Sequence, residues 1–105
     1  MTFELPSIPE NSDWFYPDEV ASKLIARELK REIGPQHPLF SVSERLVVIA
    51  QCSANDDVLV LDPEDRQNVF CLHLTWSGTY DQMPTKYPEF LTISNTDLTR
   101  FLNDY

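Results

Sequence analysis

The chain has 105 residues, of which 42% are hydrophobic and 24% charged, enough apolar sequence for one domain with its own core. Seventeen acidic residues against eight basic ones give a net charge of −9, which argues against binding to nucleic-acid phosphates or anionic membrane surfaces. No apolar run approaches the roughly 20 residues that a membrane-spanning helix needs. The two cysteines do not form a disulfide framework, and the acidic N-terminal stretch lacks the features of a secretory signal, so we expect a cytoplasmic protein.

Residues 1–16 are predicted to form an extended arm, because Pro6 and Pro9 resist helix formation. Several aromatic and aliphatic side chains in this arm indicate that it packs on the body of the protein. Residues 17–105 are expected to form a single α+β domain. At its start, residues 17–33 carry apolar side chains at helical spacing, with Pro17 in the first turn and Gly34 just after the last, which predicts a helix over this range.

Three strand-like segments follow, at 45–52, 57–61 and 68–76. The connections between them are too short for parallel crossovers, so the pattern indicates an antiparallel meander. Residues 90–93 are a candidate fourth strand, and residues 97–103, capped by Asn95 or Thr96, a last helix. The prediction is an α+β fold: one long N-terminal helix packed on a three- to four-stranded antiparallel sheet, then a short C-terminal helix.

Three fragments, GPQHPL at 34–39, DDVLVL at 56–61 and HLTWSG at 73–78, resemble the signature of a small bacterial family without an established function. The resemblance spans about residues 18–94 and would make the protein bacterial. It implies no activity, cofactor or partner, and only marks the segments where a site is to be sought first.

A metal site is one hypothesis for the histidines and cysteines. His73 follows Cys71 at strand spacing, so the two side chains share a face, and adding Cys52 and His37 gives a ligand set suited to zinc. The spacing is not that of a zinc finger, and cysteines are often buried for packing alone. We therefore predict no metal site and no other cofactor.

A nucleophilic site is a second hypothesis, with either cysteine as nucleophile, a histidine as base, and Asp56 or Asp57 as the orienting acid. A reactive thiolate needs an electropositive, partly exposed setting, whereas these cysteines lie in or beside apolar strands of an acidic chain. The chain also lacks the common hydrolase, zinc-protease and phosphate-loop motifs. We therefore predict no catalytic residue.

Binding through loops is the interpretation that remains. The segment 76–90 carries aromatic side chains of the kind enriched at interfaces, and Asp56 with Asp57 belongs to an acidic cluster, although the plainer interpretation of these two aspartates is a turn. The candidate binding residues are His37, Asp56, Asp57, His73, Thr75, Trp76, Tyr80 and Tyr87.

These observations favour a small acidic protein-binding module that regulates a basic partner protein, in the manner of an inhibitor or immunity protein. The alternative is a small-ligand-binding or hydrolytic protein with its site near His37 and His73. A homodimer is a third hypothesis, which applies if Val69, Cys71, His73 and Thr75 form an outward, semi-apolar sheet face.

Overall fold

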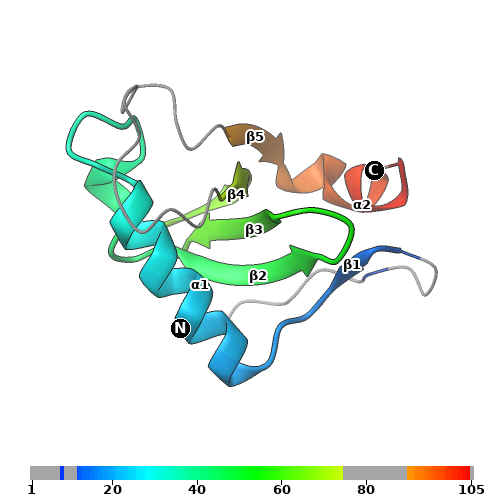
Figure 1. The fold of residues 1–105 in the computed structure, drawn as a ribbon. Helices are drawn as coiled ribbons and strands as arrows, with labels where there is room; N and C mark the ends of the chain where they lie inside the picture. Colours follow the sequence, from blue (N-terminus) through cyan, green and yellow to red (C-terminus); the bar gives the residue numbers. More distant parts are fainter. Residues whose placement is uncertain (1–7, 9–11, 75–89, 105) are drawn as a thin grey trace.

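The computed structural model describes Ile8, residues 12–74 and residues 90–104, and shows an α+β fold (Figure 1). Five antiparallel strands lie in the order of the chain: β1 (Trp14–Phe15), β2 (Val47–Cys52), β3 (Asp57–Asp62), β4 (Asp65–His73) and β5 (Phe90–Ser94). The antiparallel meander and the short C-terminal helix are confirmed. The sheet has five strands rather than three or four, because residues from the predicted arm pair with β2 and the candidate fourth strand is formed.

Helix α1 (Glu19–Glu32) has 14 residues and is shorter than the predicted range. The Asp18 carboxylate accepts a hydrogen bond from the Ala21 N–H at 2.8 Å, which makes Asp18 the N-cap and leaves Pro17 outside the helix. At the other end, Ile33 donates its N–H to the Leu29 carbonyl, and the chain leaves the helix before Gly34.

The hairpin between β3 and β4 is tighter than the predicted loop of residues 62–67. Asp62 accepts a hydrogen bond from the Glu64 N–H, and Asp65 accepts one from the Gln67 N–H. These side-chain bonds to the backbone hold a short turn, as aspartates commonly do. Strand β4 therefore begins at Asp65, three residues earlier than predicted, and ends at His73.

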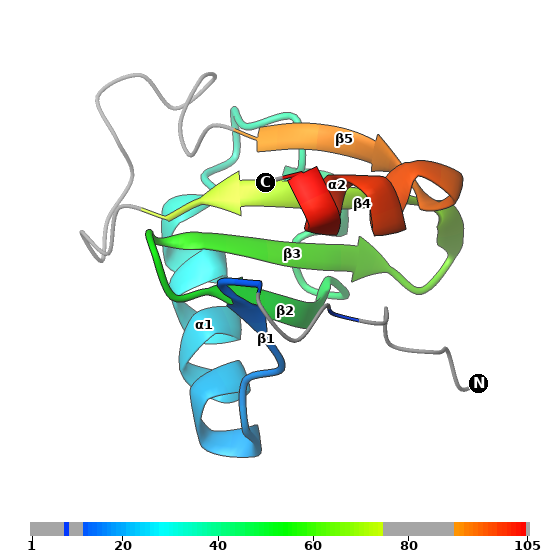
Figure 2. The same ribbon diagram turned by 90° about the vertical axis from the view of Figure 1, so that its right-hand side faces the viewer.

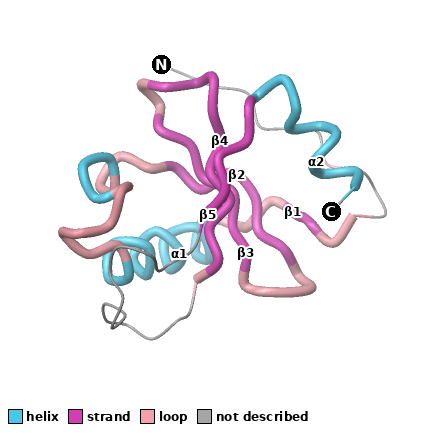
Figure 3. Tube along the Cα trace, turned by 90° about the horizontal axis from the view of Figure 1, so that it is seen from above, coloured by secondary structure: helices cyan, strands magenta, loops and turns pink. Residues whose placement is uncertain are grey.

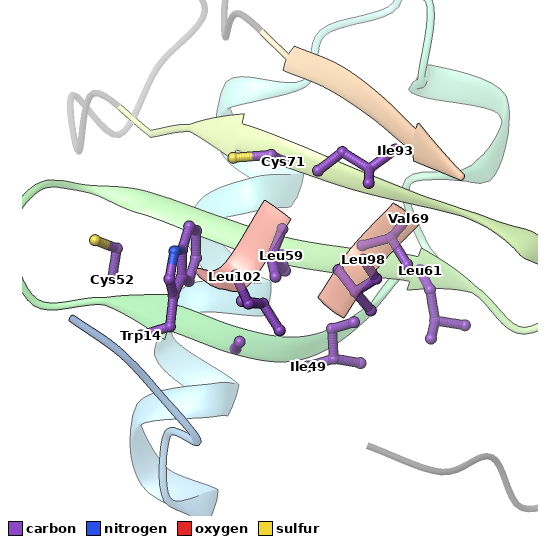
Figure 4. Close-up of a cluster of buried hydrophobic side chains, with 11 residues drawn as sticks. Trp14, Ile49, Cys52, Leu59, Leu61, Val69, Cys71, Ile93, Leu98 and Leu102 are labelled. Carbon is purple, nitrogen blue, oxygen red and sulfur yellow. The ribbon is translucent and has the colours of Figure 1, made fainter. Parts of the chain in front are cut away.

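Both faces of the sheet are covered, α1 lying on one face and α2 (Leu98–Asp104) on the other (Figures 2 and 3). Alternation along the strands divides the buried side chains between two clusters. Ile25 and Leu29 of α1 pack with Val58, Val60 and Leu72. On the α2 side the cluster comprises Trp14, Ile49, Ala50, Cys52, Leu59, Leu61, Val69, Cys71, Ile93, Leu98 and Leu102 (Figure 4).

The outward, semi-apolar sheet face considered from the sequence does not exist at Val69 and Cys71. Both side chains are buried in the cluster beneath α2. The condition that the sequence set for a homodimer through this face is therefore not met at these two residues, because α2 supplies a second layer that covers them. Thr75, the last member of that set, lies outside the described residues.

Strand β1 is held by one large side chain. Trp14 is 2% exposed, lies opposite Cys52 in the register of β2, and has its ring centroid 5.9 Å from that of Phe101 in α2. The next residue, Phe15, lies on the opposite face and is 42% exposed. Within the described part of the chain, no helix is long and apolar enough to cross a membrane.

Candidate functional site

Four of the eight candidate binding residues lie within the described chain: His37, Asp56, Asp57 and His73. Thr75, Trp76, Tyr80 and Tyr87 lie outside it. The four described residues do not form one site, since His37 lies on the α1 side of the sheet and His73 follows Cys71 on the α2 side.

The side chains of Asp57 and His73 are hydrogen-bonded to each other across the start of β3 and the end of β4. They are register partners, and Nδ1 of His73 lies 2.7 Å from Oδ1 of Asp57. The imidazole is exposed while the carboxylate is mostly covered. With a hydrogen on Nδ1 the ring is oriented by the carboxylate, and Nε2 is left as a proton acceptor, which is the arrangement of an oriented general base.

Cys71 does not complete a nucleophilic site with this pair. Burial raises the pKa of the Cys71 thiol to about 12, with the negative charge of Asp57 and the nearby Cys52 thiol adding to the rise. A thiol with that pKa stays protonated at neutral pH and is a poor nucleophile. The sequence correctly placed Cys71 and His73 on one face, but the same alternation buries Cys71 under α2.

The two cysteines are also too far apart for a disulfide. Cys52 lies on β2 beside Trp14 and Cys71 lies on β4, with β3 between them (Figure 4). Two inter-strand spacings of about 4.8 Å separate their backbones by more than the roughly 7 Å that a disulfide allows. Both are buried free thiols.

His37 stabilises the loop that follows α1. Its Nδ1 accepts a hydrogen bond from the Leu39 N–H at 3.0 Å, and its ring centroid lies 5.4 Å from that of Phe90. The imidazole is buried. These contacts join the loop to the edge of β5, so the described geometry gives His37 a structural role.

The acidic cluster lies at the two ends of β3, and most of its members have structural partners. Its members are Asp56, Asp57, Asp62, Glu64 and Asp65. At one end, Asn55 Oδ1 accepts a hydrogen bond from the Asp57 N–H at 2.8 Å, which confirms the turn interpretation there. At the other end, the buried Asp62 receives two hydrogen bonds from Arg45, at 2.8 and 2.9 Å, and Glu64 lies 3.3 Å from the same guanidinium.

The Arg45–Asp62 contact changes the titration of both groups. Hydrogen bonds from Arg45 hold the pKa of Asp62 below its ordinary value, against the opposing effect of burial, and the Glu64 N–H adds to the lowering. The hydrogen bond to Asp62 likewise raises the pKa of Arg45. This pair ties the segment just before β2 to the β3–β4 turn.

Exposed side chains lie along β1, and among them the sequence singled out only Asp56. We define the β1 surface by Asp13, Phe15, Tyr16 and Asp56, all of them exposed. The Asp13 carbonyl accepts hydrogen bonds from the N–H and hydroxyl of Ser53, which brings the strand against the β2–β3 loop that contains Asp56. The sequence placed Phe15 and Tyr16 in an arm that packs on the body. It could not show that Trp14 is buried while Phe15 and Tyr16 are exposed, because this depends on how β1 pairs with β2.

A groove of about 270 Å³ lies between α1 and β2 and opens widely to solvent. It is lined by Glu19, Ser22, Lys23, Ala26, Leu46, Val47 and Val48, and by none of the candidate binding residues. Within residues 12–74 and 90–104, no three histidine, cysteine, aspartate or glutamate side chains are grouped so that they could hold a metal ion.

Comparison of the chain with protein-family models, with curated proteins and with solved structures finds no match. The resemblance of its three fragments to a bacterial family therefore stays a prediction.

Proposed function

We propose that the protein is a small acidic binding module that regulates a basic partner protein, and that it acts in the cytoplasm. The observation that carries the proposal is the β1 surface, where Phe15 and Tyr16 are exposed next to the exposed Asp13 in the chain, and where the Asp13 carbonyl is bonded to Ser53 of the loop that contains the exposed Asp56. Aromatic residues supply most of the energy at protein interfaces, and carboxylates attract a basic partner and orient its approach.

The distribution of charge supports a basic partner. Residues 18–32 hold four acids and four bases, so the whole excess of −9 belongs to the rest of the chain. The exposed Asp13 and Asp56 contribute to this excess and form no side-chain ion pair within the described residues. A surface with this composition favours fast, salt-sensitive association.

The test is affinity capture from a lysate of the native host with wild-type protein and two double variants. Asp13→Asn with Asp56→Asn removes two charges from the β1 surface, and Glu44→Gln with Asp97→Asn removes two exposed charges elsewhere. We expect one basic protein to be retained at low salt by wild type and by the second variant, and to be lost from the first. Equal retention by both variants, or no retained protein with wild type, would contradict the proposal.

One observation favours a second candidate function, hydrolysis of a small substrate. The exposed His73 is oriented by Asp57 as a general base would be, and could activate water. The test is hydrolysis of p-nitrophenyl acetate as a function of pH. If the pair acts as a base, His73→Gln abolishes turnover and Asp57→Asn lowers it. Equal rates for wild type and His73→Gln would exclude this function for the probe's class of activated esters.

A further inference from the structure

Strand β5 forms one edge of the sheet, opposite the edge formed by β1 (Figure 2). In an antiparallel sheet each strand directs alternate N–H and C=O groups toward each of its two sides, so an edge strand keeps about half of them for a further strand. Within the described chain, no backbone hydrogen bond joins residues 90–93 to any segment other than β4. Leu91, Thr92 and Ser94 are exposed. The outer side of β5 is therefore open to another strand.

The two edges of the sheet differ in the features that usually prevent pairing with another chain, which are shortness, charge, proline and a bulge. Strand β1 has only two residues, follows Asp13 directly and is followed by Pro17 two positions later. Strand β5 has five residues and contains neither a charged residue nor a proline. Its register with β4 is regular throughout, whereas the β2–β3 and β3–β4 pairings are each interrupted by an irregularity. The β5 edge is therefore suited to pairing and the β1 edge is not.

Side chains on both faces of the sheet hold β5 in place. On the α1 side, the ring centroid of Phe90 lies 5.4 Å from that of His37 and 6.1 Å from that of Phe70. On the α2 side, Ile93 is 8% exposed and belongs to the buried cluster beneath α2. Because the strand is already ordered in the single chain, little conformational entropy is lost when a second strand pairs with it.

Strand β5 is complementary to itself in the antiparallel direction. A two-fold axis at Thr92, the middle residue of the strand, pairs all five residues of one copy with those of another and forms at least about four backbone hydrogen bonds. Strand alternation puts Leu91 on the α2 side together with Ile93. The same axis therefore places Leu91, which is 61% exposed, opposite Ile93 of the second copy.

The absence of charge on this edge favours a second copy over a basic protein as the occupant. Neither β5 nor the residues of β4 that pair with it, 68–72, carry a charged side chain, although 24% of the whole chain is charged. Two copies of a chain with a net charge of −9 repel one another, so they need a contact that brings no like charges together. A basic partner, in contrast, gains no charge attraction from β5 itself.

We propose that the protein forms a homodimer in which β5 pairs antiparallel with β5 of a second copy about a two-fold axis at Thr92, joining the two sheets into one. This dimer differs from the one considered from the sequence, which used a face of β4 rather than the edge of the sheet. The contact is small for a protein interface, so the dimer is weak and forms at micromolar to millimolar concentration. The β1 surface lies at the other edge, so this proposal and the proposed function fail independently.

The first test is sedimentation equilibrium from about 10 µM to about 1 mM, the range in which weak dimers dissociate. We expect the wild-type mass to rise from 12.2 kDa toward twice that value. Thr92→Lys places two lysines directly opposite each other and is expected to raise the dissociation constant at least about fivefold, although it reduces the net negative charge of each copy. The control Val20→Lys, at a residue 69% exposed on the first turn of α1 and away from β5 (Figure 2), is expected to associate at least as well as wild type does. A wild-type monomer throughout, or association that Thr92→Lys leaves unchanged, would overturn the proposal.

The second test identifies the position of the two-fold axis. Thr92→Glu, like Thr92→Lys, places like charges opposite one another and is expected to weaken association when studied alone. In an equimolar mixture of the two variants, a lysine faces a glutamate across the axis, and association is expected to return at least to the wild-type level. Circular dichroism of each variant shows whether the sheet is intact. A mixture of folded variants that stays monomeric would refute pairing about Thr92.

The third test is the effect of salt on wild-type association. Because salt screens the repulsion between two acidic copies and the β5 contact contains no ion pair, the dissociation constant of the dimer is expected to fall between about 50 and 500 mM NaCl. Capture of a basic partner through the β1 surface has the opposite salt dependence, so the two associations are distinguishable. A dimer that dissociates as salt rises would contradict an uncharged contact.

Discussion

Replacement of Trp14 by alanine tests how β1, and with it the β1 surface, is held on the sheet. The strand has only two residues, paired with Gln51 and Cys52, and Trp14 is the one side chain of the two that is buried. An indole that is 2% exposed removes about 200 Å² of largely apolar surface from water, which at about 25 cal/mol per Å² corresponds to about 5 kcal/mol. Because the unfolded chain already buries part of this area, the expected loss of stability is about 3–4 kcal/mol.

The assay is urea unfolding of wild type, Trp14→Ala and the control Phe15→Ala, followed by far-ultraviolet circular dichroism. A domain of this size has a stability of about 5–15 kcal/mol, so the Trp14 variant is expected to unfold at much lower urea concentration and the control to change by less than about 1 kcal/mol. Comparable small losses for both variants would show that β1 does not depend on Trp14, and would refute the reasoning from burial.

Three further predictions follow from individual contacts. Asp62→Asn is expected to lower the free energy of unfolding by about 1–3 kcal/mol at neutral pH, since it weakens charged hydrogen bonds to Arg45. Because the pKa of Asp62 is lowered in the folded state, this difference from wild type should persist above the unfolded-state value of about 3.9 and shrink as the pH falls below it, which denaturation at pH 7 and pH 3 measures. A difference that grows in acid would contradict that sign. Both cysteines are expected to resist iodoacetamide in the folded protein at pH 8, and mass spectrometry should find two modifications only after unfolding in urea; rapid labelling of Cys71 in the folded state would disprove its burial. Asp18→Ala is expected to cost about 1 kcal/mol through loss of the N-cap, whereas Asp18→Asn should cost less, and equal losses in urea unfolding would argue against the cap.

Helices and strands could be predicted from the sequence where periodicity or loop length allowed only one structure. Helix α1 shows an apolar period close to 3.6 residues, and its real start differs from the prediction only because Asp18 caps the helix. Strands β2 and β3 are apolar on both faces, which indicated a buried position, and both faces are indeed covered. The short connections required antiparallel pairing, and the register confirms it.

The candidate site was harder to predict from the sequence, because the role of a polar residue depends on which residue faces it across the sheet. His37 and His73 were grouped as neighbours of one site, but alternation and the covering helices put them on opposite sides. Asp57 and His73 meet because they are opposite one another in the register of β3 and β4. The spacing of residues within one strand does not reveal this register. Arg45 and Asp62 are 17 positions apart, and nothing in the chain marked them as partners.

The sequence by itself determined the class of fold, the antiparallel order of the central strands and the excess of negative charge, because these depend on local periodicity, loop length and composition. Tertiary structure alone decided which face each layer covers, that Trp14 is buried while Phe15 is exposed, and that Val20 and Leu24 of an amphipathic helix stay exposed. The physical reason is that burial is a property of the partner surface. A short strand such as β1 or a short helix such as α2 carries too little pattern of its own to show what it will cover.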